Sequence, residues 1–167
     1  MKNLIFKFLF LATLITVSSC GKDDKVMGCT DPDSINYNPL AEEDDASCEY
    51  FKDKFVGKWE VDNFRIGADD LITLGYLTNV EFEFDADFDF EWTGEDTANT
   101  FYSGSGDWEV DGDEVKITFS SNSDFFCSGN EDGHDFEFDF NQSFEEVDLE
   151  DTCNGSGDSI EISLDKK

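Results

Sequence analysis

The chain has 167 residues, with 11 Lys and Arg against 41 Asp and Glu, and a formal net charge of −30 at pH 7. So negative a surface repels the phosphates of nucleic acids and of anionic lipids, which excludes nucleic acid as a partner. Aromatic residues make up 15% of the chain and alternate with the acidic ones, so the acidity does not indicate disorder.

The amino-terminal segment has the organisation of an export signal. Two lysines form a basic start, and residues 8–17 carry no charge. This run is shorter than the roughly 20 residues that a membrane-spanning helix needs, and it fits the apolar region of a signal peptide. The letters VSSC, which end at Cys20, resemble the lipobox of bacterial lipoproteins. The resemblance implies that residues 1–19 are the signal peptide and that Cys20 is lipidated; the alternative is an ordinary signal peptide with a chance cysteine.

Residues 20–27 form a polar tether after this cysteine. The letters GKDD at residues 21–24 are similar to the surface-export signal of Bacteroidetes lipoproteins. This resemblance implies an outer-membrane protein on the cell surface, and the alternative is an anchor that faces the periplasm. Since two or more acyl chains hold a protein stably on a membrane, we expect membrane contact through the lipid.

Four cysteines remain after Cys20, and an even number in an exported protein favours disulfides. Three pairings are open. We predict Cys29 with Cys48 and Cys127 with Cys153, because each disulfide then lies within one predicted domain. The chain-entropy model gives about 3–3.5 kcal/mol for each loop. The cysteines have no CxxC spacing, which argues against metal ligation by them.

Residues 28–50, GCTDPDSINYNPLAEEDDASCEY, have no apolar face to bury. Two prolines disfavour helix, and the Asp and Asn side chains favour turns, so a disulfide is needed to hold the loop. The segment resembles a short repeat of exported Bacteroidetes proteins, close to GCTDPxAxNYNPxATxDDGSCxY, from which it departs at Ser34, Glu42 and Ala46. The resemblance implies a compact disulfide-closed module outside the cell.

Hard oxygen ligands of the kind that Ca²⁺ prefers are concentrated in this module. The spacing is not that of an EF-hand. Two hypotheses stay open: a structural loop, and a loop with calcium as its cofactor. The candidate calcium ligands are Asp31, Asp33, Asn36, Asn38, Asp44 and Asp45.

From residue 54 onward the pattern has a period of two. In NVEFEFDADFDFEWTG, at residues 79–94, apolar and acidic residues alternate, which indicates half-buried antiparallel strands. The pair Asp111-Gly112 predicts a hairpin turn, and residues 68–79 are left as a loop or a short helix. The predicted strands are Trp59–Arg65, Val80–Asp85, Phe88–Thr93, Thr100–Val110, Glu114–Ser120, Asp135–Phe140, Phe144–Leu149 and Ser159–Leu164.

Eight short strands in succession predict an all-β fold, either an up-and-down barrel or a sandwich. The letters VGKW at residues 56–59 and the spacing G-x-W-x-x-x-G-D at residues 106–113 resemble the lipocalin-like domain of small Bacteroidetes lipoproteins. This resemblance implies an eight-stranded antiparallel up-and-down barrel over residues 54–167.

The interior of such a barrel holds either packed side chains or one small ligand. Bulky rings on the predicted inner face either fill the core or line a pocket for a small apolar molecule. The candidate lining residues are Phe82, Phe84, Phe88, Phe90, Trp92, Trp108, Phe119, Phe136, Phe138 and Phe140.

The sequence carries no recognisable catalytic motif. The single histidine, His134, lies among acidic residues and is interpreted as a solvated loop residue, with metal ligation as the alternative. No nucleophile has a recognisable histidine partner, and no glycine-rich loop precedes a helix. We therefore interpret the chain as a non-catalytic surface lipoprotein for binding or display. The alternatives are a carrier of a small hydrophobic ligand and a calcium-dependent adhesion or envelope protein.

Overall fold

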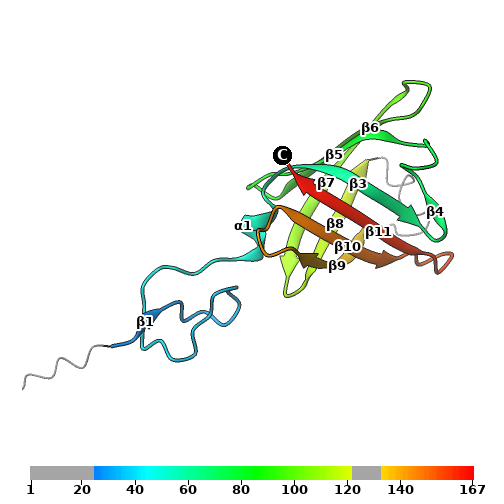
Figure 1. Cartoon of the computed structure of the whole chain (residues 1–167). Coiled ribbons are helices and arrows are strands. Elements are labelled where there is room, and N and C mark those ends of the chain that lie inside the picture. Colours follow the sequence, from blue (N-terminus) through cyan, green and yellow to red (C-terminus); the bar gives the residue numbers. More distant parts are fainter. Residues whose placement is uncertain (1–24, 122–132) are drawn as a thin grey trace, which may run out of the picture.

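A computed structural model describes residues 25–121 and 133–167 (Figure 1). Eight antiparallel strands follow one another round a closed sheet, and the last, β11, pairs with the first, β3. The predicted eight-stranded up-and-down barrel is therefore confirmed. The barrel strands are β3 (Gly57–Ile66), β5 (Thr78–Phe84), β6 (Asp89–Glu95), β7 (Phe101–Asp111), β8 (Glu114–Ser121), β9 (His134–Phe140), β10 (Glu146–Thr152) and β11 (Ser159–Lys166).

Four small elements complete the described chain. The strands β1 (Met27–Gly28) and β2 (Glu43–Asp44) pair in parallel within the amino-terminal module. The helix α1 (Phe51–Phe55) connects the module to β3, and β4 (Asp69–Asp70) pairs with the far end of β3. None of the helices in the described ranges is long and apolar enough to cross a membrane.

Two predicted strand starts are wrong, and both for the same reason. Phe88 and Phe144 have positive φ angles of 71° and 57°, so each lies in a hairpin turn and the strand begins after it. The apolar side chain fits the strand pattern, but the left-handed backbone does not. The ambiguous segment 68–79 forms β4, a set of turns and the first residues of β5.

The period of two separates the inner and outer faces of the wall. Along β5, Val80, Phe82 and Phe84 are buried, while Glu81 and Glu83 between them are partly exposed. Successive side chains of a strand point to opposite faces, so the rings gather inside and the carboxylates outside.

Glycines make room for the largest inward rings. Across the β6–β7 ladder, Phe90 lies opposite Gly106 and Trp92 lies opposite Gly104. Gly106 also lies at a register shift between β7 and β8, where a Cβ atom would come within 2.0 Å of the backbone oxygen of Thr118. The wall can therefore bend inward at this point only without a side chain on residue 106.

The helix α1 seals one end of the barrel (Figure 1). Phe55 is fully buried, and its ring centroid lies 5.4 Å from that of Phe84 and 4.9 Å from that of Phe140. The backbone oxygen of Phe55 accepts a hydrogen bond of 2.6 Å from Nε1 of Trp59. Helix and first strand are thus fixed to each other inside the same aromatic cluster.

Carboxylates face one another across the outside of the wall. Glu137 of β9 lies opposite Glu150 of β10, which in turn lies opposite Glu161 of β11. Like charges directly opposite each other destabilise a sheet. At Asp165, an exposed residue of β11, slight desolvation of the carboxyl and the nearby carboxylates, Asp62 first among them, raise the pKa.

Gly106→Ala should destabilise the barrel by roughly 2–4 kcal/mol, because the backbone of β8 must move to admit the new methyl group. Asp107→Ala is the matched control, since Asp107 is the exposed neighbour on the same strand, and it should change the free energy of unfolding by no more than about 0.5 kcal/mol. Urea denaturation followed by tryptophan fluorescence measures both. Equal stability of the two variants would contradict the predicted clash.

Asp165→Asn should raise the melting temperature at pH 7, by about 1–2 °C. Because the pKa of Asp165 is higher in the folded state, the folded state binds more protons near that pKa, and its stability falls as the pH rises through it. At pH 3 the gain in melting temperature from Asp165→Asn should be largely lost. Asp87→Asn in the exposed β5–β6 turn is the control for net charge. A gain that is the same at both pH values would show that charge repulsion is not the cause.

Candidate functional site

The barrel interior holds most of the predicted pocket residues. Three of the ten, Phe119, Phe138 and Phe140, are partly buried and pack against the core. Phe88 does not line the interior: its side chain is 44% exposed in the β5–β6 turn, with its ring against Trp108. The fully buried members of the predicted set are Phe82, Phe84, Phe90, Trp92, Trp108 and Phe136.

Rings fill the half of the barrel that α1 seals. The ring centroid of Phe84 lies 5.1 Å from that of Phe90 and 5.3 Å from that of Trp108. Phe82 lies edge-on to Phe90 at 5.3 Å. Such distances are those of aromatic pairs in direct contact. In this half the rings therefore pack against one another.

His134 is interpreted from the sequence as a solvated loop residue, and the structure shows that this interpretation is wrong. The residue begins β9 with a side chain only 1% exposed, and its Nδ1 lies 2.6 Å from Oδ2 of Asp151 on β10. The ladder between the two strands ends at the pair of Glu137 and Glu150, so this side-chain bridge continues it. The missed signal is the period of two, which places His134 in phase with the buried Phe136.

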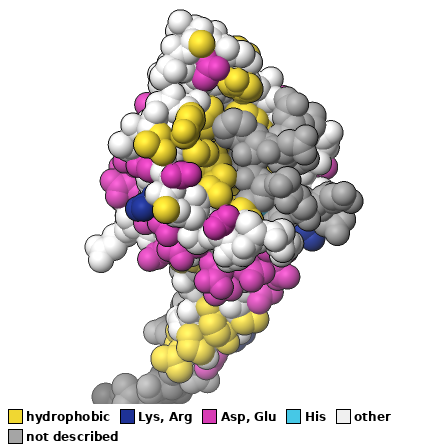
Figure 2. All heavy atoms as spheres, turned by 90° about the vertical axis from the view of Figure 1, so that its right-hand side faces the viewer, with side chains coloured by type: hydrophobic (Ala, Val, Ile, Leu, Met, Phe, Trp, Pro, Cys, Tyr) yellow, Lys and Arg dark blue, Asp and Glu magenta, His cyan; other side chains and the backbone are white. Residues whose placement is uncertain are grey.

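The end of the barrel opposite α1 is here called the mouth; its described loops are residues 67–77, 96–100 and 153–158. Figure 2 faces this end and shows apolar side chains gathered on it. Leu74 is 54% exposed, and Tyr76 and Phe101 are each 63% exposed. Because most apolar side chains of this size are buried in a folded protein, this group makes the mouth the candidate site for binding.

Aspartate side chains hold the mouth loops in shape. Asp70 accepts hydrogen bonds from the backbone N–H groups of Ile72 and Thr73 and from the Thr73 hydroxyl. Asp96 accepts from the N–H groups of Ala98 and Thr100. These hydrogen bonds, those from Thr73 and Thr100 foremost, lower the pKa of both carboxyls. The exposed apolar side chains are thus carried by loops that are tied locally.

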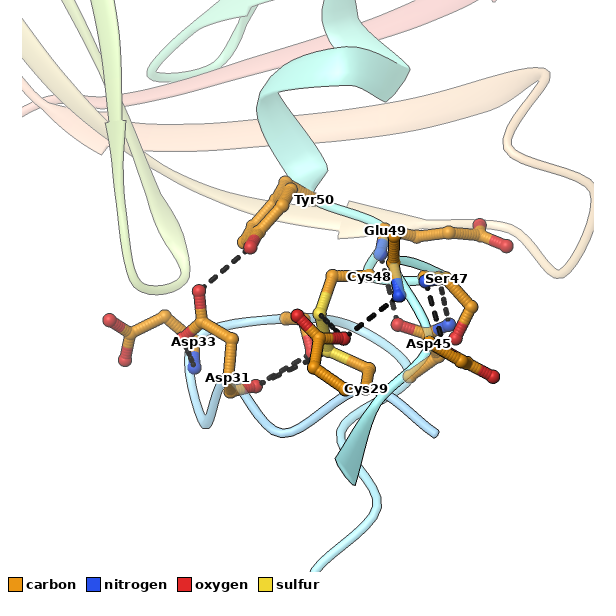
Figure 3. The surroundings of a disulfide bond; sticks show 12 residues. Cys29, Asp31, Asp33, Asp45, Ser47, Cys48, Glu49 and Tyr50 are labelled. Carbon is orange, nitrogen blue, oxygen red and sulfur yellow. Dashed lines mark hydrogen bonds between the residues drawn. A yellow bond between two sulfur atoms is a disulfide. The ribbon is translucent and has the colours of Figure 1, made fainter. Parts of the chain in front are cut away.

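The predicted disulfide between Cys29 and Cys48 is confirmed (Figure 3). It closes a module whose last residue, Tyr50, donates a hydrogen bond of 2.7 Å from its hydroxyl to Oδ2 of Asp31. Cys153 is buried and disulfide-bonded. Its predicted partner, Cys127, lies outside the described residues, so that pairing stays a prediction. Cys20, the predicted lipidation site, also lies outside them.

Five of the six candidate calcium ligands accept hydrogen bonds from the backbone of the module. Asp31, Asp44 and Asp45 each accept a hydrogen bond from the backbone N–H two residues on. Asn38 does the same for Leu40, and Asn36 accepts from the N–H of Glu49. Within the described ranges, no three His, Cys, Asp or Glu side chains are grouped so that they could hold a metal ion.

Asp33 is the exception among the six, because its exposed carboxylate takes no part in these turns. Four of the hydrogen bonds are those of Asx turns, and the fifth, from Glu49 to Asn36, joins distant parts of the loop. They give these five Asp and Asn residues a structural role that needs no cation, and calcium binding stays a prediction.

No family model matches the chain, and no curated protein does. Among solved structures it is similar to a lipocalin-like protein from Bacteroides uniformis ATCC 8492, with 15% identity over 68% of this chain and 99% of the other, and a TM-score of 0.48. An uncharacterized protein from Bacteroides eggerthii DSM 20697 has 14% identity over 68% of this chain and 99% of its own, and a TM-score of 0.46. The zebrafish ileal bile acid-binding protein, complexed with cholic acid, has 17% identity over 68% and 98%, and a TM-score of 0.38. The strand pairing of the chain itself shows a closed, eight-stranded antiparallel barrel.

Proposed function

We propose that this protein is a lipid-anchored, non-catalytic binding protein of the outer membrane, which presents the mouth of its barrel to the cell surroundings. The observation that carries the proposal is the opposite placement of two features. The module, with the start of the described chain, adjoins the end that α1 seals (Figure 1), and the exposed apolar side chains lie at the other end (Figure 2).

The anchor is supported by the sequence of the amino-terminal segment. A basic start and an uncharged run lead into the lipobox-like VSSC, which ends at Cys20. Cys20 lies only a few residues before the module. An acyl group at Cys20 therefore brings the membrane next to the module and leaves the mouth facing away. The acidic wall agrees with this arrangement, since it is repelled by anionic headgroups and needs a lipid to stay close to them.

An apolar ligand is supported by the chemistry of the mouth. Leu74, Tyr76 and Phe101 offer apolar area without a basic side chain among them. Behind them the barrel interior is aromatic. A small hydrophobic molecule, or an apolar group of a larger one, matches this surface better than a charged ligand does. The single histidine is buried and bonded to Asp151, which supports binding rather than catalysis.

The binding proposal is tested with the apolar fluorophore N-phenyl-1-naphthylamine. We expect saturable fluorescence enhancement, and about a tenfold weaker Kd in the double variant Leu74→Ser/Phe101→Ser, because two half-exposed apolar groups lose their contact with the probe. Leu40→Ser is the matched control: Leu40 is 75% exposed but lies in the module, so its loss should change Kd less than twofold. Equal weakening by the mouth and module variants would contradict a site at the mouth.

The anchor is tested independently by intact mass and by protease treatment. The protein extracted from its own membrane should have the mass of residues 20–167 plus acyl chains, and Cys20→Ser should release it from the membrane fraction. Added protease should digest the protein on intact cells. Resistance on intact cells, with digestion after lysis, would place the anchor on the periplasmic face instead.

A further inference from the structure

A groove of about 480 Å³ lies between the module and the barrel, at the end opposite the mouth. Three segments line it: residues 32–34 of the module, residues 50–52 around the start of α1, and residues 110–112 at the β7–β8 hairpin. Its volume is in the range of ligand sites, which often form where two structural units meet. The barrel mouth and the membrane anchor do not account for this groove.

Both walls of the groove are fixed. On the module side, the Tyr50 hydroxyl is bonded to Asp31, as Figure 3 shows, and the buried Ser34 hydroxyl donates to the backbone oxygen of Asp31 at 2.7 Å. On the barrel side, the Phe51 ring lies edge-on to Phe138 at 4.9 Å and stacks on Phe140 at 5.9 Å. A ligand therefore meets a preformed surface rather than two units that must first be ordered.

The chemistry of the lining points to a cation. Tyr50 and Phe51 are half-buried aromatic side chains, while Asp33 and Asp111 are exposed. Within the described ranges neither carboxylate forms an ion pair. The chain already places one ammonium group here, since Nζ of Lys52 lies 5.4 Å from the centroid of the Tyr50 ring. Aromatic faces and unpaired carboxylates both favour a cationic group.

We propose that this groove binds an arginine-bearing segment of a partner protein, with the guanidinium group against the Tyr50 ring and within reach of Asp33 and Asp111. The net charge of −30 attracts a basic partner and repels an acidic one. Arginine suits the groove because its planar group stacks on an aromatic ring while its N–H groups bind carboxylates. In this position it replaces the ammonium group of Lys52.

The test is an NMR titration of the ¹⁵N-labelled full chain, in a non-ionic detergent and 150 mM NaCl, with the peptide Ac-Gly-Arg-Gly-NH₂. We expect saturable shifts at the amides of Ser34, Tyr50 and Gly112. The peptide in which citrulline replaces arginine has the same shape without the charge, and it should cause no shift there. Equal shifts with both peptides would overturn the proposal, because a cation would then not be what the groove recognises.

Two pairs of variants separate the groove from the general charge of the chain. The double variant Asp33→Asn/Asp111→Asn should raise the Kd of the arginine peptide about tenfold. The double variant Asp139→Asn/Asp148→Asn, on the outer wall, removes the same charge and should change this Kd less than twofold.

Lys52→Gln should tighten binding about twofold by removing the competing ammonium group from the ring, while Lys116→Gln on β8 should not. Equal weakening by both aspartate pairs, or shifts spread over the outer strands without saturation, would show attraction by net charge alone and overturn the site. Three of the four variants change exposed side chains, the fourth changes the partly exposed Lys116, and thermal melts verify that each is folded.

Discussion

The alternation of inward and outward side chains along the barrel strands is the constraint on which the remaining structure depends. A chain with 41 acidic residues can form a core only if every strand directs its carboxylates to water. β5 shows the principle, with Phe82 and Phe84 inside and Glu81 and Glu83 outside. A one-residue slip in register would bury the acidic set and expose the rings, so the charge that repels across the outer wall also fixes how the strands pair.

Local alternation explains why the strands could be predicted and why some contacts could not. The eight strands and the Cys29–Cys48 disulfide follow from patterns within short windows. Phe88 fits such a window, yet its φ of 71° places it in a turn, and the turn geometry depends on how β5 meets β6. The burial of His134 and Phe55 depends on partners distant in sequence, Asp151 for one and the Phe84 and Phe140 rings for the other. Asp and Asn in the module predicted turns and calcium alike, because the same oxygen atoms serve both.

The five-residue helix α1 gives the two ends of the barrel different characters. One of its phenylalanines, Phe55, closes the aromatic core, and the other, Phe51, packs on Phe138 and Phe140 of β9 beside the module. The barrel therefore has a ring-filled end that is attached to the module and an end with exposed apolar side chains on its loops that is not. The proposed guanidinium groove and the proposed apolar mouth are consequently at opposite poles, and both can be occupied at once.

The pairing of β3 with β11 joins the first and last strands of the barrel, with Trp59 opposite Lys166. This ladder cannot form until the residues of β11 have been synthesised, and contacts so distant in sequence form slowly. Meanwhile strands such as residues 80–92 have phenylalanine at alternate positions and open edges, a combination that promotes aggregation. The acidic residues between the rings keep incomplete chains apart by repulsion. Charge that weakens the finished wall thus protects the chain before the wall exists.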